Sequence, residues 1–199
     1  MDIRYIRCID SLPPVGELEK TWAGMSPTGG SESMHLMYLM SITSARKTID
    51  LSAAYFVPDD LTIRTLIEAS KRGVRIRILM PGKFIDSDLV KAASRERWPE
   101  LLAAGVKLAE YQPTMFHVKG LIVDTLLVSV GSTNFDNRSF SINDEANLNV
   151  LDPVFARQQE VIFEADWRLA KQVTKEAFRE RPWWQRVTTG VASLVKAQL

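Results

Sequence analysis

The order of strand-like and helix-like segments constrains the fold of this chain more than any other sequence feature. Two apolar β-type runs are each followed by a segment whose apolar residues recur at helical spacing. In chain order these four segments are 48–57, 59–73, 74–82 and 88–105. After a further strand-like run at 106–112, three more follow with no helix between them: 116–124, 126–134 and 146–152. Alternating β and α segments favour parallel strands, whereas consecutive strands pair antiparallel. The pattern therefore predicts an α/β fold with a mixed β-sheet and helices on both faces.

Glycine and proline mark the expected ends of the helices. Gly73 and Gly105 are predicted to close the two helices that follow the β-type runs, and Pro99 is predicted to kink the second. Further helices are expected from Ser33 onward, over 154–173 and near the C-terminus. Residues 11–33 concentrate Pro, Gly and Ser, which predicts a loop.

The composition is that of one globular domain. With 199 residues, 46% hydrophobic and 25% charged, the chain can bury a single core of ordinary size. No window approaches the roughly 18 apolar residues of a membrane-spanning helix, and the first ten residues lack the apolar stretch of a secretory signal. The net charge of +1 argues against bulk electrostatic binding of nucleic acid. The single cysteine, Cys8, is interpreted as a small buried residue.

The run FHVKGLIVD (116–124) places a histidine and a lysine side by side on a predicted buried strand. Because side chains alternate across a strand, His117 and Lys119 share one face and Val118 points to the other. A bare cation in a core is costly, whereas a phosphate between the two side chains would satisfy both. The pattern therefore predicts an anion site that requires no metal.

The next segments supply further polar groups. Gly131 permits a tight turn at the end of the following strand, and Ser132 and Asn134 carry a hydroxyl and an amide two residues apart. If the two strands pair, these groups and the two cationic side chains converge on one spot that can hold phosphoryl oxygens. Glu145, on the segment NDEANLNV, is expected to accept a hydrogen bond from one ring nitrogen of His117 and so fix its tautomer.

Two successive segments resemble the HKD motif of the phospholipase D superfamily. They are HVKGLIVD and, after it, GSTNFDNRSFSINDE. Four further segments are similar to the second, C-terminal half of bacterial cardiolipin synthases. They are YFVPD, KRGVRIRILMPG, LLAAGVKLAEYQPTMFH, and NFDNRSF with the Asn and Glu that follow it. The similarity covers most of residues 33–186. It implies a phospholipase D-like fold that carries one HKD half.

The resemblance implies metal-free phosphodiester exchange through a phosphohistidine, with no cofactor. In that chemistry His117 is either the nucleophile or the general acid for the leaving alcohol. Lys119, Ser132 and Asn134 would stabilise the pentavalent phosphorane. Asp124 is the third letter of the motif, but it lies at the end of the strand with the opposite parity to Lys119. We therefore expect Asp124 to make structural hydrogen bonds rather than to contact phosphorus.

This chain contains one such motif and no internal repeat. In the superfamily the histidine of a second motif protonates the leaving oxygen and later activates the acceptor, so the resemblance implies a second half-site. It would come from another copy in a homodimer or from an N-terminal half that this sequence lacks. The other histidine, His35, lies among methionines in a predicted helix and is interpreted as a packed residue.

Several functions stay open at this point. The resemblance favours phosphatidyl transfer to a phosphatidylglycerol-like phospholipid, by a cytoplasmic enzyme bound peripherally at the inner membrane. The alternatives are a phospholipase D-type hydrolase, a single-motif homodimeric endonuclease, and a non-catalytic half that docks with a partner or a membrane. The near-neutral charge counts against the endonuclease.

Three regions are expected along the chain: an N-terminal extension (1–32), a catalytic domain (33–178) and a C-terminal amphipathic helix (179–199). In the last region, Trp183 and Trp184 between arginines suit a membrane interface or a protein contact equally well. Five basic residues that alternate with apolar ones are interpreted as a solvated face. They are Arg64, Lys71, Arg72, Arg75 and Arg77.

Overall fold

The computed structural model describes residues 19–25, 33–136 and 145–179, and within these ranges eight strands form one sheet. In spatial order the strands are β1 (Glu19–Met25), β9 (Glu145–Leu151), β7 (Leu127–Gly131), β6 (Lys119–Val123), β2 (Thr48–Ala53), β4 (Arg75–Pro81), β5 (Lys107–Tyr111) and β10 (Ala170–Val173). Two short strands, β3 (Phe56–Val57) and β8 (Phe135–Asp136), pair with each other in parallel.

The sheet is mixed, as the segment order predicts. Strands β2, β4 and β5 run parallel to one another, whereas β6 pairs antiparallel with both β2 and β7. Strand β9 continues the antiparallel side beyond β7. Strand β6, which begins at Lys119, therefore lies in the interior of the sheet with a hydrogen-bonded neighbour on each side.

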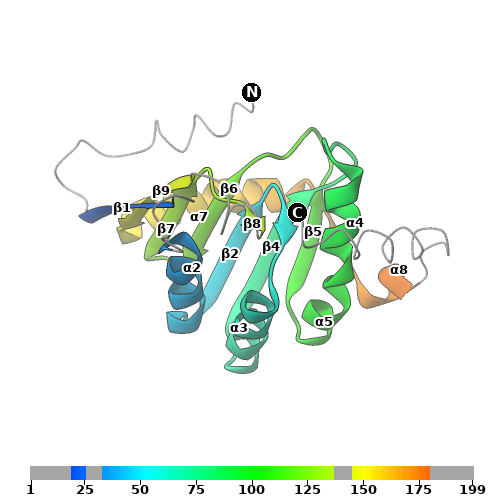
Figure 1. Cartoon of the computed structure of the whole chain (residues 1–199), viewed down its shortest axis with the longest axis horizontal. Helices are drawn as coiled ribbons and strands as arrows, with labels where there is room; N and C mark the ends of the chain where they lie inside the picture. The colour runs from blue at the N-terminus through cyan, green and yellow to red at the C-terminus, as the bar shows by residue number, and fades with distance from the viewer. Residues whose placement is uncertain (1–18, 26–32, 137–144, 180–199) are drawn as a thin grey trace.

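Helices cover both faces of the sheet, which confirms the predicted architecture. Helices α2 (Ser33–Ser44), α3 (Asp60–Lys71), α5 (Trp98–Ala103) and α8 (Lys175–Arg179) contribute to one core cluster, and α7 (Pro153–Arg168) contributes to the other. Figure 1 shows α2, α3 and α5 in front of the sheet and α7 behind it. Helix α4 (Asp88–Glu96) packs against β3. None of the described helices is long and apolar enough to cross a membrane.

Helix α3 shows why these segments begin and end where they do. The Asp59 carboxylate accepts a hydrogen bond of 2.7 Å from the backbone amide of Thr62 and so caps the first turn. Ile63 and Leu66, nearly one turn apart, are buried in the core. Gly73 adopts a φ of 92°, a conformation that favours glycine, just after the helix ends. The predicted helix and its glycine stop are confirmed.

Two predicted segments near the N-terminal side differ from the structure. Residues 19–25, predicted as loop, form the edge strand β1, because their backbone pairs along the whole length of β9. The strand predicted for 48–57 is interrupted at Ala54 and Tyr55. Its second part is β3, which pairs with β8 rather than with the large sheet. In both cases hydrogen-bond partners distant in the sequence override the local pattern.

The C-terminal part combines a confirmed break with a wrong boundary. The predicted interruption at Pro99 separates α4 from α5, and this proline lies in the first turn of α5. The helix predicted for 154–173 ends at Arg168. Residues 170–173 instead pair antiparallel with β5, because the open edge of that strand offers backbone partners. Most of the predicted C-terminal helix lies outside the described residues, as does Cys8.

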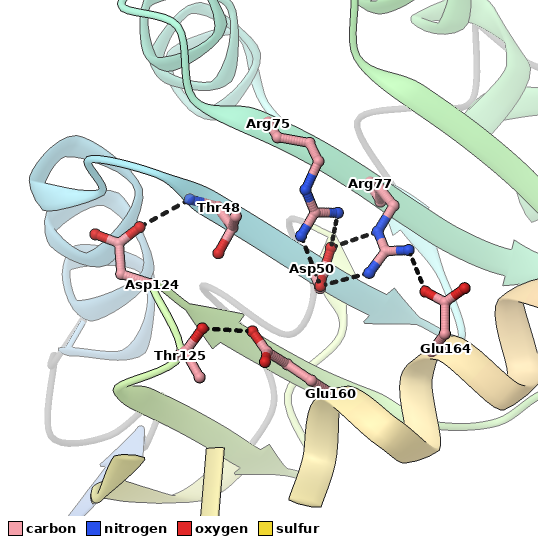
Figure 2. Close-up of polar contacts among 8 residues, drawn as sticks. All are labelled: Thr48, Asp50, Arg75, Arg77, Asp124, Thr125, Glu160 and Glu164. Atoms are coloured by element: carbon pink, nitrogen blue, oxygen red, sulfur yellow. Dashed lines mark hydrogen bonds and ion pairs between the residues drawn. The ribbon is translucent and has the colours of Figure 1, made fainter. Parts of the chain in front are cut away.

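A buried ion cluster joins the sheet to α7 (Figure 2). Asp50 on β2 is 1% exposed, and its carboxylate lies 2.8 Å from Nε of Arg77 on β4. A terminal nitrogen of Arg77 lies 2.6 Å from the carboxylate of Glu164 on α7. Arg75, which is partly exposed, shares the Asp50 carboxylate at 3.0 Å. The prediction of a solvated face is wrong for Arg77, because α7 covers that face of the sheet. The guanidinium of Arg77 stays charged when buried because it pairs with Asp50 and Glu164.

Candidate active site at the start of β6

The predicted histidine–lysine pair lies where the chain enters β6. Lys119 is 7% exposed, and its Nζ donates a hydrogen bond of 3.3 Å to the carbonyl oxygen of His117. His117, just before the strand, is exposed. Val118 packs against the cluster on the α7 side, whereas Leu121 belongs to the opposite cluster. The alternation predicted for this segment is therefore present, with the lysine on the same strand parity as Leu121.

The ammonium group of Lys119 is poorly compensated by the protein. Burial lowers the pKa of Lys119 to about 8, although the carboxylates of Glu145, Asp86 and Asp136 act in the opposite direction. A buried cation in this condition is stabilised by a ligand that brings negative charge. The electrostatics therefore support an anion site next to an exposed imidazole.

The affinity of this site for anions is expected to fall as the pH rises through about 8, because Lys119 loses its charge there. Dimethyl phosphate is a suitable probe, since it remains a monoanion over this range. We expect binding about tenfold weaker at pH 9 than at pH 7, measured by calorimetry. Lys119→Arg, whose guanidinium stays charged, should flatten the profile. An unchanged affinity for the wild type between these pH values would contradict the assignment.

The end of β7 approaches the start of β6 because the two strands are antiparallel, with Gly120 opposite Val130. A Cβ at Gly131 would lie 2.2 Å from the carbonyl oxygen of Ala146, so this position requires glycine. The close approach lets Ser132 bond to β9: its Oγ accepts a hydrogen bond of 3.1 Å from the backbone amide of Ala146. The strand pairing on which the predicted convergence depends is therefore present.

The turn that carries Asn134 is held from beneath by a buried asparagine. Asn147 donates from Nδ2 to the hydroxyl of Tyr38 at 2.7 Å and to Oγ of Ser129 at 3.0 Å. Its Oδ1 accepts from the backbone amide of Thr133 at 3.3 Å. By contrast, Oδ1 of Asn134 is buried and has no hydrogen-bond partner among the described residues. Such an atom suits a donor supplied by a ligand or by another chain.

Glu145 is the first residue of β9, next to the residue that bonds Ser132. Among the carboxylates that raise the pKa of Lys119, its influence is the largest. The structure thus brings Glu145 to the side of the site where Lys119 lies. The hydrogen bond expected between Glu145 and His117 stays a prediction.

Asp124 directly follows the last residue of β6, whereas His117 precedes the first. Its carboxylate accepts hydrogen bonds from the backbone amides of Arg46, Lys47 and Thr48 at 2.8, 2.7 and 2.8 Å. Burial alone would raise the pKa of Asp124, but these donors hold it below its usual range. The next residue, Thr125, donates to Glu160 on α7 at 2.8 Å. Asp124 thus ties the β6–β7 turn to the start of β2, in keeping with the expected structural role.

The sequence pattern assigns no role to Tyr55, whose ring contacts His117, or to Asp86, the hydrogen-bond partner of Tyr55. The ring of Tyr55 meets the imidazole edge-on, with centroids 5.8 Å apart and an interplanar angle of 85°. The hydroxyl of Tyr55 donates a hydrogen bond to Asp86. Both belong to connections between elements, where periodicity carries no information, and they are 31 residues apart. For Tyr55 the sequence signal is the YFVPD segment, which indicates a family resemblance and no role.

His35 is held by the start of α3. Its Nε2 lies 3.3 Å from the Asp59 carboxylate and 3.2 Å from the hydroxyl of Thr62. The interpretation as a packed helix residue is confirmed in part: His35 lies on α2 and is largely buried, but its ring nitrogen has polar partners.

The described residues contain no group of three or more His, Cys, Asp or Glu side chains that could hold a metal ion. The ammonium, hydroxyl and amide near the start of β6 are hydrogen-bond donors. Such donors suit phosphoryl oxygens.

The fold and the site together define a phospholipase D-like domain. The sheet is mixed with helices on both faces, a histidine–lysine pair lies at the start of an interior strand, and a glycine–serine turn lies on the neighbouring strand. A family model described as "Cardiolipin synthase, PLD-like domain" matches residues 38–167. The chain belongs to this family.

The curated relatives agree with this assignment. Cardiolipin synthase A of Pseudomonas entomophila is 34% identical over 186 residues, which cover 94% of this chain and 38% of that protein. Cardiolipin synthase of Geobacillus kaustophilus is 35% identical over 197 residues, covering 96% of this chain and 39% of that protein. The chain therefore spans well under half the length of these relatives.

Solved structures show the same fold. The phospholipase D family member Nuc from Salmonella typhimurium superposes with a TM-score of 0.68 at 24% identity, over 79% of this chain and all of that one. Phosphatidylserine synthase from Haemophilus influenzae gives a TM-score of 0.71 at 17% identity, over 94% of this chain and 49% of that one.

Proposed function

We propose that this chain is a phosphatidyl-transfer domain of the cardiolipin synthase type. It moves a phosphatidyl group from one phospholipid to a hydroxyl of a second, phosphatidylglycerol-like phospholipid at the cytoplasmic face of a membrane. The observation that carries the proposal is the buried ammonium of Lys119, which donates a hydrogen bond to the carbonyl oxygen of the exposed residue His117. The ammonium of Lys119 favours a bound anion, and the imidazole of His117 can then act on that anion as a nucleophile or an acid. The names of the curated relatives support a phospholipid as the substrate.

The reaction we propose needs two imidazoles. One attacks phosphorus, and the bond between phosphorus and the leaving alcohol oxygen breaks, which forms a phosphohistidine. The other gives its proton to that oxygen and then removes the proton of the acceptor hydroxyl, whose oxygen displaces the histidine. His117 supplies one of the two. Lys119, Ser132 and Asn134 donate hydrogen bonds to the non-bridging oxygens, which gain charge in the pentavalent transition state.

The second imidazole comes, in this proposal, from a second HKD half. A second copy of the chain is one source, and an N-terminal half is the other. The length comparison supports the N-terminal half, because the chain matches 38–39% of the relatives. The match to the whole length of the solved Salmonella chain supports the second copy, because that chain is no longer than one such domain.

Incubation of the purified chain with phosphatidylglycerol vesicles tests the transfer. We expect cardiolipin and one released glycerol for each cardiolipin formed. If a second copy completes the site, specific activity should rise with protein concentration, and sedimentation should place the active material at twice the monomer mass. Formation of phosphatidic acid instead of cardiolipin would contradict transfer and favour hydrolysis. A monomeric, inactive chain that becomes active when an N-terminal half is added in trans would exclude the homodimer.

A further inference from the structure

Tyr55 and Asp86 form a hydrogen-bonded pair next to His117. Tyr55 lies in the connection that follows β2, and Asp86 lies in the connection between β4 and α4. Strands β2 and β4 are parallel neighbours, so both connections begin at the same side of the sheet, where the carboxyl ends of these strands lie. The pair therefore stands at the edge of the proposed phosphoryl site, in contact with its imidazole through the ring of Tyr55.

The pair presents hydrogen-bond acceptors to a ligand. Burial, reinforced by the hydrogen bond and charge of Asp86, raises the pKa of Tyr55 above its usual value, so its hydroxyl stays protonated and donates. Asp86 is exposed, and Tyr55 is its one hydrogen-bond partner within the described ranges. A carboxylate has about four acceptor sites, and the described residues use one of those on Asp86.

A phosphate group is a poor ligand for Asp86, because like charges repel. The carboxylate is nevertheless close enough to the phosphoryl site to raise the pKa of Lys119. A carboxylate in this position suits the part of a phosphodiester that carries donors, namely the hydroxyls of a glycerol headgroup or an ammonium group. We infer that Asp86, oriented by Tyr55, binds the donor-bearing headgroup of the phosphodiester held at His117 and Lys119. This inference rests on the proposed function and adds the group that the site selects.

The test compares the binding of three soluble phosphodiesters to the full chain by calorimetry. Glycerophosphoglycerol carries hydroxyls, glycerophosphoethanolamine carries an ammonium, and dimethyl phosphate carries no donor. We expect the wild type to bind at least one of the first two about tenfold more tightly than dimethyl phosphate, the effect of a hydrogen bond to a charged group. The tighter of the two identifies whether hydroxyls or an ammonium supply the donors.

Asp86→Asn should reduce that preference to within about twofold and leave the affinity for dimethyl phosphate equal or higher, because a repelling charge has been removed. Tyr55→Phe, which keeps the ring beside His117, should reduce the preference partly. The matched control is Asp88→Asn, an exposed acid two residues away in the first turn of α4. It should behave as the wild type.

Two failures can be told apart in this experiment. A wild type that binds dimethyl phosphate but shows no preference, or an Asp86→Asn variant that keeps the full preference, would overturn the headgroup subsite alone. A wild type that binds none of the three diesters would overturn the anion site and with it the proposed function.

Discussion

Replacing His117 with alanine is expected to lower the rate of phosphatidyl transfer by at least about a thousandfold, the usual order of loss when a nucleophile or its proton partner is removed. Lys119 and Ser132 would still be present, so the variant should still bind a phosphodiester but should not transfer it. His117 is exposed, and its loss should leave the fold intact. Conversion of labelled phosphatidylglycerol at saturating concentration, with circular dichroism on the same samples, measures both expectations.

The chain offers a matched control, because it contains one other histidine. His35 contacts Asp59 and Thr62 at the start of α3. His35→Ala should therefore lower thermal stability modestly while keeping the transfer rate within a few-fold of the wild type. Transfer through His117 would be wrong if His117→Ala kept a tenth of the wild-type rate or if the two variants lost activity equally.

Among the substitutions proposed for this chain, Asp50→Ala should lower the free energy of unfolding the most. Asp50 is 1% exposed and is the shared partner of Arg75 and Arg77. Its removal would leave the mostly buried guanidinium of Arg77 with Glu164 as the one acidic partner that the described residues supply. Breaking a buried ion pair from one side commonly costs about 3–5 kcal/mol, because the remaining charge is uncompensated. We expect the free energy of unfolding in urea to fall by about that amount.

An exposed ion pair serves as the comparison. Lys71 and Glu68 lie 2.8 Å apart on α3, with side chains 65% and 61% exposed. Glu68→Ala should leave the free energy of unfolding nearly unchanged, because solvent screens such pairs. A similar small effect for Asp50→Ala would show that the buried cluster does not stabilise the sheet–helix contact.

Local sequence information was sufficient for much of the fold. The stop at Gly73 and the break at Pro99 depend on residues within one turn of each other, and both predictions are confirmed in the structure. The edge strands β1 and β10 could not be predicted in the same way. Their backbones are extended because β9 and β5 offer partners from distant parts of the chain.

In the candidate site, too, local features can be predicted from the sequence, and contacts between distant elements cannot. The period of two along a strand predicts His117 and Lys119 on one face, because both lie in one short segment. The partners of Asp50 come from β4 and α7, and Tyr55 meets Asp86 across two connections. Charge pairing between elements depends on their packing, which no local pattern of polar residues specifies. For that reason the local pattern predicts a solvated Arg77 and gives Asp86 no role.

The pairing of β1 with β9 also decides where an independently folding unit of this protein begins. The seven residues of β1 lie opposite the whole of β9, and Met25 is opposite Glu145. A fragment that started at residue 33 would leave the backbone of β9 as an open edge, which favours pairing with other chains. It would also remove the backbone neighbour of the acid with the largest influence on Lys119. Excision or transplantation of this domain should therefore keep the segment before α2.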